Sequence, residues 1–447
     1  MFFALTKRLI TTVNPRLLWK FLWNFGFKGL IASEKFKRRI KRGEYFPAYL
    51  HISITNQCNL KCQGCWVDVD APVEMISYEE LDKIIKDCKK HGNNFFGILG
   101  GEPFFHPDIF KIIENHPDCY FQVFTNGQPI TKEVASRLRA AGNVSPLISI
   151  EGDEVVSDER RGGKAVFNRT FAGLKNCLEA GLLTGVATSL CKNNIDTLLT
   201  EQWLKRLIDV GVHYVWYYAY RPVGAVMRTD LALTAEQLIR SRKFIVEMRC
   251  RLPIIIIDAY YDHLGRSLCP SATGLSHHIN WRGEIEPCPV IQFACQNIRD
   301  GESIYELISK SEFLKDYRKT ASGALRGCIV LERPDLLKSL VLKHNARDTT
   351  ARQTVLKELD AMEPKFSQWL PGYEIPEKHW MYYWMKKLWF NDFGAYKDAQ
   401  HNVEAKRVAV RTALADNPEL ASESVNADSQ NKMMEWKKDK QQIEVCK

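Results

Sequence analysis

The strongest constraint on the fold is a regular alternation of strand and helix signals between residues 48 and 260. Short runs rich in β-branched and aromatic residues predict strands, and the longer periodic segments between them predict helices. Strands that alternate with helices at this spacing form right-handed βαβ units around a parallel sheet, either open or closed into a barrel. The fold class is therefore α/β, and functional residues are expected at the carboxyl ends of the strands. The predicted strands cover residues 48–55, 94–100, 120–125, 144–150, 184–190, 213–220 and 253–258.

Composition and pattern divide the chain into five parts. A basic arm (1–46) precedes the alternating core (47–260), and a turn-rich segment with clustered cysteines follows the core (261–335). Residues 336–400 are aromatic and are predicted to form a helical extension. Residues 401–447 are polar with few large apolar side chains, which predicts a disordered tail.

The N-terminal arm holds the entire net charge. Residues 1–45 carry eleven Lys or Arg against two Glu, which equals the formal charge of +9 for all 447 residues. The neutral remainder argues against nucleic acid as a partner. Basic residues in the arm alternate with aromatic and aliphatic ones, so two interpretations stay open: a helix that lies in a lipid headgroup layer, or a helix packed on the body with its charges in water. A membrane anchor of this kind would be removable without loss of any metal site.

Composition also excludes several classes of protein. No uncharged apolar run approaches the roughly 20 residues that cross a bilayer, and no small-residue cleavage site follows the apolar part of the arm. Thirteen cysteines in 447 residues are too sparse for a disulfide-stapled scaffold. The clustering of some of them indicates metal or catalytic use instead.

The first cysteine cluster directly follows the first predicted strand. Cys58, Cys62 and Cys65 form a CxxxCxxC spacing on one loop. Three thiolates on so short a loop suit a multi-iron site better than a structural zinc ion, which normally takes four protein ligands. A zinc loop with a distant fourth ligand, or three structural thiols, is the alternative.

Characteristic turns follow the next three strands. They are Gly100–Pro103 (GGEP), Thr125–Gly127 (TNG) and Ser149–Gly152 (SIEG), with Arg160 and Arg161 shortly after. Paired glycines let the backbone approach a ligand closely, and a carboxylate can bind a ligand's ammonium group. Each turn is ordinary by itself, because turns use these residues for backbone reasons. Their position one strand after another beyond the cysteine loop makes them significant together.

The cysteine loop and these turns resemble the signature of the radical S-adenosylmethionine (radical SAM) superfamily. The resemblance implies a partial (βα)6 TIM-like barrel in which Cys58, Cys62 and Cys65 bind three irons of a [4Fe-4S] cluster, while S-adenosylmethionine chelates the fourth iron. It also implies that Glu102 binds the methionine ammonium, and it leaves Glu151 where an aspartate is more usual. The implied cofactor-binding residues are Trp66, Gly100, Gly101, Glu102, Pro103, Asn126, Ser149, Glu151 and Arg161.

A second cysteine set lies mainly in the third part of the chain. Cys269 and Cys288 flank a predicted hairpin at residues 277–287, and this stretch resembles the twitch and SPASM domains of the same superfamily. The resemblance implies one auxiliary [4Fe-4S] cluster in a small C-terminal domain, with Cys328 as third ligand and either Cys295 as fourth ligand or an open iron. No CxxC pair follows Cys328, so a second auxiliary cluster is not expected. By spacing alone, a zinc-bound or structural cysteine hairpin is the alternative.

The resemblance further implies the reaction. An electron from a low-potential donor of the flavodoxin or ferredoxin type enters the first cluster and passes to the sulfonium, the C5′–S bond breaks, and a 5′-deoxyadenosyl radical abstracts hydrogen from a substrate. The substrate is left open between a lipid or isoprenoid and a peptide. An oxygen-sensitive cluster places the protein in a reducing cytoplasm, free or peripheral on the inner membrane surface. The alternatives are an iron-sulfur electron carrier, which has no use for the GGEP turn, and an RNA-modifying member of the superfamily.

Overall fold

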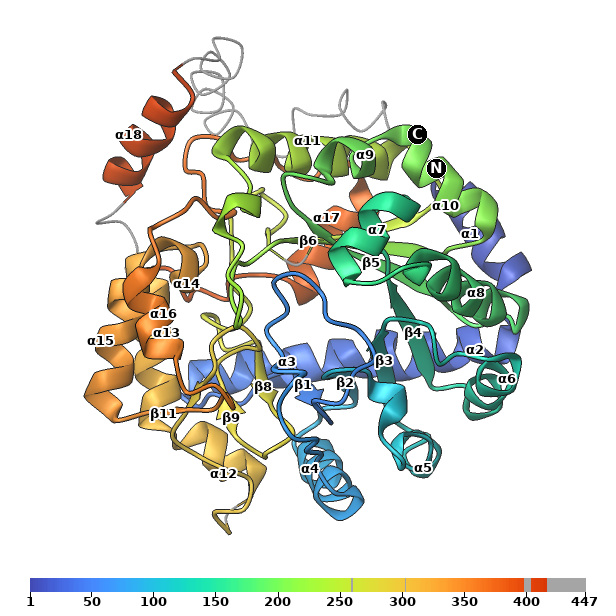
Figure 1. Cartoon of the computed structure of the whole chain (residues 1–447), viewed down its shortest axis with the longest axis horizontal. Helices are drawn as coiled ribbons and strands as arrows, with labels where there is room; N and C mark the ends of the chain where they lie inside the picture. Colours follow the sequence, from blue (N-terminus) through green and yellow to red (C-terminus); the bar gives the residue numbers. More distant parts are fainter. Residues whose placement is uncertain (259, 302, 398–402, 416–447) are drawn as a thin grey trace.

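One nine-stranded sheet forms the centre of the computed structural model, which describes residues 1–258, 260–301, 303–397 and 403–415 (Figure 1). The strand order is β7-β6-β5-β4-β3-β2-β1-β8-β9. Neighbours from β7 to β8 pair in parallel, and β8 and β9 are antiparallel. Every strand predicted between residues 48 and 260 is confirmed. The strands are β1 (Tyr49–Ser53), β2 (Phe95–Leu99), β3 (Tyr120–Thr125), β4 (Val144–Ser149), β5 (Gly185–Leu190), β6 (Tyr214–Ala219), β7 (Ile255–Ile257), β8 (Ser276–Ile279) and β9 (Ile285–Glu286).

Helices connect successive strands and pack around the sheet (Figure 1). The helix after β1 begins at a reciprocal capping box formed by Ser77 and Glu80. The connecting helices are α4 (Tyr78–Lys90), α5 (Ile109–Asn115), α6 (Lys132–Ala141), α7 (Glu154–Arg161), α8 (Val166–Glu179), α9 (Ile195–Leu198), α10 (Glu201–Val210) and α11 (Ala235–Arg251), with short 3₁₀ turns η2 (Pro103–Phe105) and η3 (Thr229–Leu231).

The sheet curves into a partial barrel. His51 on β1 and Trp216 on β6 line the same cavity, although four strands separate β1 from β6 in the sheet. Across the interior, the Gln122 side chain on β3 donates to the Tyr214 hydroxyl on β6 at 3.2 Å. Beyond β7, the Ile256 N–H donates to the Tyr382 hydroxyl of α17 (Trp380–Trp389) at 2.9 Å. Helix α17 therefore covers the free edge that the open barrel leaves at β7.

The N-terminal arm is helical throughout. It forms α1 (Phe2–Thr12), α2 (Pro15–Lys20), the π-helix η1 (Phe21–Phe27) and α3 (Lys28–Lys41). None of the helices in the described ranges is both long and apolar enough to cross a bilayer. The arm runs across the back of the sheet in the view of Figure 1.

Basic residues of the arm bind the carboxyl ends of core helices. Arg8 donates to the carbonyls of Ile208 and Val212, at 3.1 and 2.6 Å, at the end of α10. Lys20 donates to the Ala141 carbonyl at the end of α6, at 2.7 Å. These carbonyls carry partial negative charge, which a cation stabilises. Because each such helix ends where the next strand begins, the arm lies at the amino edge of the sheet, opposite the cysteine loop.

The arm is thus packed on the body, which is one of the two interpretations left open by its sequence. Several charged side chains of the arm, however, bind backbone carbonyls of the body. Lys28 donates to the Asp118 carbonyl at 2.7 Å, and Arg39 donates to the carbonyl of His91 at the end of α4. The expectation that the arm is removable without affecting the core therefore conflicts with its contacts.

The segment after β7 joins the core. The predicted hairpin is confirmed as β8 and β9, and β8 pairs in parallel with β1 in the register Leu50↔His277. The hairpin therefore extends the barrel sheet beside the strand that leads into the cysteine loop. The remaining elements are β10 (Phe293–Ala294), α12 (Ile304–Ser309), α13 (Glu312–Ala324), α14 (Ile329–Glu332), α15 (Pro334–His344), β11 (Arg347–Asp348) and α16 (Val355–Ala361).

Part of the predicted disordered tail is a helix, α18 (Val403–Ala413). Val410 and Leu414 are buried, and Lys406 forms an ion pair with Glu332 at 3.0 Å. The prediction was wrong there because two apolar residues and one lysine suffice to dock a short helix on the body. Residues 401–402 and 416–447 of the predicted tail lie outside the described residues.

Candidate active site

The first cysteine loop lies at the carboxyl edge of the sheet, directly after β1. Cys58, Cys62 and Cys65 are partly buried free thiols. Burial raises the pKa of Cys58 to about 11, and burial together with the neighbouring Cys62 raises the pKa of Cys65 to about 12. Because ionising such thiols requires a compensating positive charge, the loop favours a bound metal over free thiolates.

Three glycines let other loops pack directly on the cysteine loop. Gly64 has φ +67°, and a Cβ there would lie 1.9 Å from the Tyr220 hydroxyl. A Cβ on Gly162, after α7, would lie 2.2 Å from the Lys61 carbonyl oxygen, and one on Gly224 would lie 2.0 Å from that of Cys65. No side chain fits at these positions. Sequence reasoning missed these contacts, since a lone glycine reads as an ordinary turn residue.

Gly100 and Gly101 serve the same purpose for the GGEP turn. Their Cβ atoms would lie 2.3 Å from the carbonyl oxygens of Thr55 and Gln57, respectively. The Gly101 N–H donates to the Thr55 carbonyl at 2.8 Å. The glycine pair therefore presses this turn against the backbone that leads from β1 into Cys58. Pro103 is buried and begins η2.

Glu102 joins two of the predicted turns. Its side chain is fully buried, and its oxygens accept hydrogen bonds from the Thr125 hydroxyl and the Asn126 N–H, each at 2.7 Å. The Phe104 N–H donates to it as well, at 3.2 Å. Burial raises the pKa of Glu102 to about 7, although these hydrogen bonds oppose the rise. The carboxylate thus holds the GGEP turn and the TNG turn together beneath the cysteine loop.

Asn126 connects the TNG turn to the cysteine loop. Its side-chain amide donates to the Asn59 amide oxygen at 2.7 Å and lies 4.0 Å from the Cys58 sulfur. Its own carbonyl accepts a hydrogen bond from Thr170 at 2.8 Å. The structure therefore places Asn126 beside the first cysteine, where the sequence predicts a cofactor contact.

Glu151 and Arg161 form a buried ion pair next to Cys62. An Arg161 Nη atom lies 2.5 Å from Glu151 Oε1 and another lies 3.7 Å from the Cys62 sulfur. The second Glu151 oxygen accepts from the Ser189 N–H at 3.0 Å. Burial opposes the charge of Arg161, but Glu151 and Cys62 hold its pKa above the ordinary value. Ser149 ends β4 just before this pair and is partly exposed.

Trp66 connects the cysteine loop to the β8–β9 hairpin. Its ring stacks on Trp281 with centroids 6.2 Å apart and meets His278 edge-on at 5.6 Å. His278 is itself held between Ser53 and Glu286, at 2.7 and 2.6 Å. Trp66 thus fixes the position of the first cysteine loop relative to the second cysteine set.

Three cysteines of the second set lie together. The pKa of Cys269 is raised by burial and next by Cys328, and the pKa of Cys288 is raised by burial and next by Cys269. The partly buried Arg221, just after β6, faces them. Burial opposes its charge, but the Cys328 thiol raises the pKa of Arg221. Each cysteine group therefore has a partly buried arginine beside it, Arg161 for the first and Arg221 for the second.

Cys295 is one of the two predicted possibilities for the fourth position, the other being an open iron. Its sulfur faces the His344 carbonyl at 3.6 Å. After burial, which raises its pKa, the charged groups that affect Cys295 are Arg347 and Glu284. The reason is the short pairing of β10 with β11, which turns this cysteine toward α15. Of the two predicted forms of the auxiliary site, we therefore favour the one with an open iron.

The iron content of two single variants distinguishes these cysteines. We expect Cys328→Ala to lower the iron bound by the anaerobically reconstituted protein from about eight to about four atoms per chain. Cys295→Ala is the matched control and should retain about eight. Equal losses in both variants would show that Cys295 is a ligand after all, and zinc in place of iron would exclude an auxiliary cluster.

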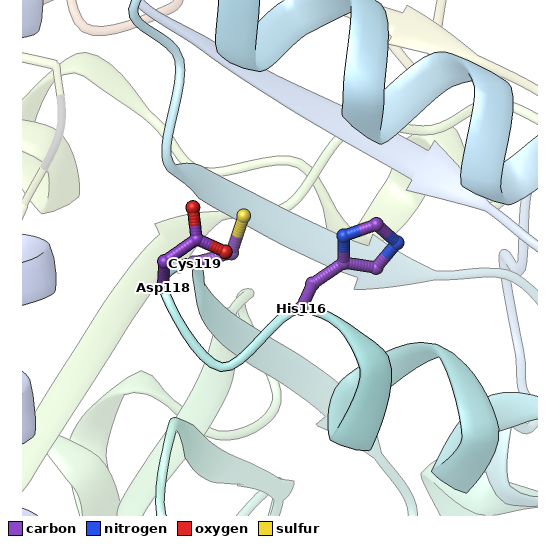
Figure 2. A group of neighbouring side chains, drawn as sticks. All are labelled: His116, Asp118 and Cys119. Carbon is purple, nitrogen blue, oxygen red and sulfur yellow. The ribbon is translucent and has the colours of Figure 1, made fainter.

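Neither cysteine triad forms a compact group of ligand atoms in the part of the chain that the structure describes. Among the described residues, only His116, Asp118 and Cys119 bring three ligand atoms within 4.8 Å of one another (Figure 2). A tetrahedral zinc ion holds each sulfur at about 2.3 Å, which places the sulfurs roughly 3.8 Å from one another. Neither cysteine triad meets that spacing among the described residues.

The group in Figure 2 does not belong to the site. It lies between α5 and β3, at the amino edge of the sheet beneath the arm. Asp118 already forms an ion pair with Lys89 at 2.8 Å, and burial raises the pKa of Cys119 to about 12. These contacts are those of a buried structural turn.

The comparisons with known proteins agree with this geometry. The AdoMet-dependent heme synthase of Methanosarcina barkeri (strain Fusaro / DSM 804) is 27% identical over 189 residues, which cover 41% of this chain and 54% of that protein. The Fe-coproporphyrin III synthase of the same organism is 30% identical over 148 residues, covering 32% and 37%. The chain thus spans about half or less of the length of these two curated relatives.

Solved structures share the fold. SuiB of Streptococcus suis bound to S-adenosylmethionine superposes with a TM-score of 0.55 at 18% identity, covering 74% of this chain and 79% of that one. Native anSMEcpe with bound AdoMet superposes with a TM-score of 0.51 at 14% identity, covering 81% and 99%. Residues 52–204 match the family model of the radical SAM superfamily. That segment contains the first cysteine loop and the GGEP, TNG and SIEG turns, so this part of the chain is similar to radical SAM superfamily proteins.

Proposed function

We propose that the protein reductively cleaves S-adenosylmethionine to methionine and 5′-deoxyadenosine and uses this cleavage to remove hydrogen from a substrate. The observation that carries the proposal is the convergence of three elements on one loop: three thiols with no fourth, the Glu102 junction, and the Arg161–Glu151 pair. When bound, a [4Fe-4S] cluster and S-adenosylmethionine supply the one-electron chemistry.

The residues of this chain have separate parts in that function. Cys58, Cys62 and Cys65 hold three irons and leave one iron for the cofactor. Arg161, 3.7 Å from the Cys62 sulfur, offsets the negative charge of the ligated thiolates. Glu151 orients Arg161, and its negative charge offsets the cost of removing the guanidinium group from water.

Glu102 and its neighbours support the cofactor contacts. We assign the methionine ammonium to the GGEP turn, with Glu102 or the carbonyls that it positions as acceptors. Three protein donors already use the carboxylate, so its first effect is to orient the turn. Trp66, Asn126 and Ser149 complete the proposed contact surface.

The second cysteine set has the composition of an auxiliary [4Fe-4S] site. Cys269, Cys288 and Cys328 provide three thiols, and the partly buried Arg221 provides a positive charge beside them. A low-potential donor of the flavodoxin or ferredoxin type is the electron source that this function requires.

The test is the reaction without a substrate. Anaerobically reconstituted wild-type protein with a strong reductant should form 5′-deoxyadenosine and methionine in equal amounts, slowly, as measured by chromatography. A fully iron-loaded protein that forms no 5′-deoxyadenosine would contradict the proposed function.

A lipid or isoprenoid is the substrate class that we favour over a peptide, because an exposed apolar surface lies on the arm and α17. Trp19, Trp23 and Phe27 are 64%, 45% and 49% exposed and stack in sequence, with centroids 6.0 and 4.9 Å apart. The surface, which we call the aromatic surface, comprises Trp19, Leu22, Trp23, Phe27, Leu30, Ile31, Trp380, Trp384 and Leu388.

The aromatic surface also carries positive charge. Lys387 lies 5.1 Å from the centroid of the Trp384 ring. Exposed tryptophans interspersed with lysine and arginine are typical of proteins that rest on an anionic lipid surface. We therefore propose peripheral contact with a membrane through this surface.

Vesicle co-sedimentation tests the contact. The triple variant Trp19→Ser, Trp23→Ser, Phe27→Ser should bind anionic vesicles at least about tenfold more weakly than wild type, because its apolar anchors are lost. High salt should weaken wild-type binding. Leu342→Ser, which replaces an equally exposed apolar residue on α15, is the control and should bind like wild type. Absence of vesicle binding by the wild-type protein would favour a peptide as the substrate class.

A further inference from the structure

The amino half of the barrel encloses a cavity of about 180 Å³. The first residues of several strands form its wall, so it lies at the end of the barrel opposite the cysteine loop. An apolar cavity of about 150 Å³ is large enough for a benzene-sized ligand. The side chains that line it from the strands include Tyr49, His51, Phe95, Tyr120, Trp216 and Ile257.

Three helices close this cavity where a complete barrel would have further strands. Phe21 and Phe25 of η1, Gly29 and Ala32 of α3, and Trp389 of α17 line it. Phe25 packs edge-on against Phe95 of β2, with centroids 4.8 Å apart. The arm and α17 therefore complete the apolar wall.

The polar side chains of the wall are largely engaged with each other. Tyr214 accepts from Gln122 at 3.2 Å and lies 2.7 Å from the Ser145 hydroxyl. Lys386 donates to Asp258 and to the Tyr261 carbonyl, at 2.5 and 2.7 Å. Water in such a cavity would find few partners, so the cavity favours an apolar occupant.

The interior continues from this cavity toward the cysteine loop. Above the cavity, Phe124 lies between His51 and Trp216, with centroids 6.2 and 5.8 Å away, and Trp216 stacks on Tyr218 at 5.2 Å. These four rings all stay partly exposed inside the barrel. Phe124 is followed directly by Thr125, which donates to Glu102. One aromatic layer therefore separates the cavity from the candidate active site.

The outer side of the same helices carries the aromatic surface. η1 contributes Phe21 and Phe25 to the cavity and Leu22, Trp23 and Phe27 to the surface. Helix α17 likewise contributes Trp389 to the cavity and Leu388 to the surface. At the seam between them, Gly29 has no side chain, and a Cβ there would be 3.7 Å from Trp389. An apolar chain leaving a membrane would meet the cavity directly behind this seam.

We propose that the barrel interior binds a flexible hydrocarbon chain, either acyl or isoprenoid, that enters at the seam between η1 and α17. The inference rests on the proposed function and deepens it, since it names the class of substrate and the end of the barrel at which that substrate enters. The aromatic layer of Phe124, Trp216 and Tyr218 lies between the chain and the carboxyl edge of the sheet.

Calorimetric titration of the full-length protein tests the proposal. Two uncharged probes are used, decanol for a straight chain and geraniol for a branched one, without S-adenosylmethionine or reductant. We expect saturable binding of one probe with a stoichiometry of one, and the probe that binds identifies the type of chain. Ala32→Leu on α3 and Ile257→Phe on β7 fill the cavity from opposite walls, and each should weaken binding at least about tenfold.

The matched control is Ala4→Leu, the same change at an exposed position of α1. It should bind the probe like wild type. Unchanged melting temperatures for the filled variants would show that they fold, because added methylenes occupy existing space. Equal binding by wild type and both filled variants, or no binding of either probe, would overturn the proposal. The binding experiment needs no radical chemistry, so the two proposals can fail separately. Probe binding by a protein that forms no 5′-deoxyadenosine would contradict only the proposed function. 5′-Deoxyadenosine formation by a protein that binds neither probe would contradict only the hydrocarbon site.

Discussion

Cys62→Ala is expected to reduce 5′-deoxyadenosine formation to background. Cys62 lies in the middle of the CxxxCxxC loop, and its sulfur is the one that Arg161 approaches, at 3.7 Å. Without it, two thiols cannot hold the cluster of the first site. The iron content should fall from about eight to about four atoms per chain, because the second cysteine set keeps its own. Iron analysis and chromatography of the reaction products measure both effects.

A buried cysteine outside both sites provides the control. Cys177→Ala removes a fully buried thiol from α8 and should lower the melting temperature slightly while leaving iron content and product formation unchanged. Substantial 5′-deoxyadenosine formation by Cys62→Ala would mean that this loop is not the catalytic one.

Glu102→Ala should give a weaker, graded effect. Removal of the carboxylate leaves the Thr125 hydroxyl and the N–H groups of Asn126 and Phe104 without their acceptor, and each unsatisfied buried group costs about 1–3 kcal/mol. The GGEP and TNG turns should then no longer be held in a fixed position relative to each other. We expect a lower melting temperature together with weaker S-adenosylmethionine binding, measured on the reconstituted protein.

Removal of residues 1–45 is expected to leave little folded protein. Leu5, Val13, Leu17 and Phe36 are buried against the body, and each large apolar side chain contributes roughly 1.5–3 kcal/mol. The deletion would also remove the cationic partners of the carbonyls at the ends of α10, α6 and α4. Soluble yield, circular dichroism and iron content measure the loss.

Point variants on the outside of the same segment are the appropriate comparison. The Trp19, Trp23, Phe27 triple serine variant changes exposed side chains and should fold with full iron content. If instead the truncated protein folded with about eight irons, the arm would be a removable anchor, as one interpretation of its sequence allows.

Local signals were sufficient for the strand order along the chain and for the first cysteine loop. The strands are short β-branched runs between turn residues, and their pattern depends on near neighbours only. The CxxxCxxC loop, the GGEP turn and the Ser77 capping box lie within a few residues each. A motif of this kind is visible in sequence because all of its residues are near neighbours in the chain.

Interactions between distant segments had to come from the tertiary structure. Spacing left either Cys295 or an open iron as the fourth position beside Cys269, Cys288 and Cys328, and only the fold shows that the Cys295 sulfur faces the His344 carbonyl. The function of Gly64, Gly162 and Gly224 likewise depends on loops that meet only in the folded chain.

The arm shows the same division most clearly. Its sequence determined that it would be helical, basic and amphipathic, since those properties follow from residues three or four apart. Only the folded barrel determines which carbonyls bind the cations of the arm. The ends of α4, α6 and α10 come together at one edge only once the parallel sheet has formed. The enclosed cavity has the same origin: its wall combines the starts of strands with η1, α3 and α17, which lie up to several hundred residues apart in the chain.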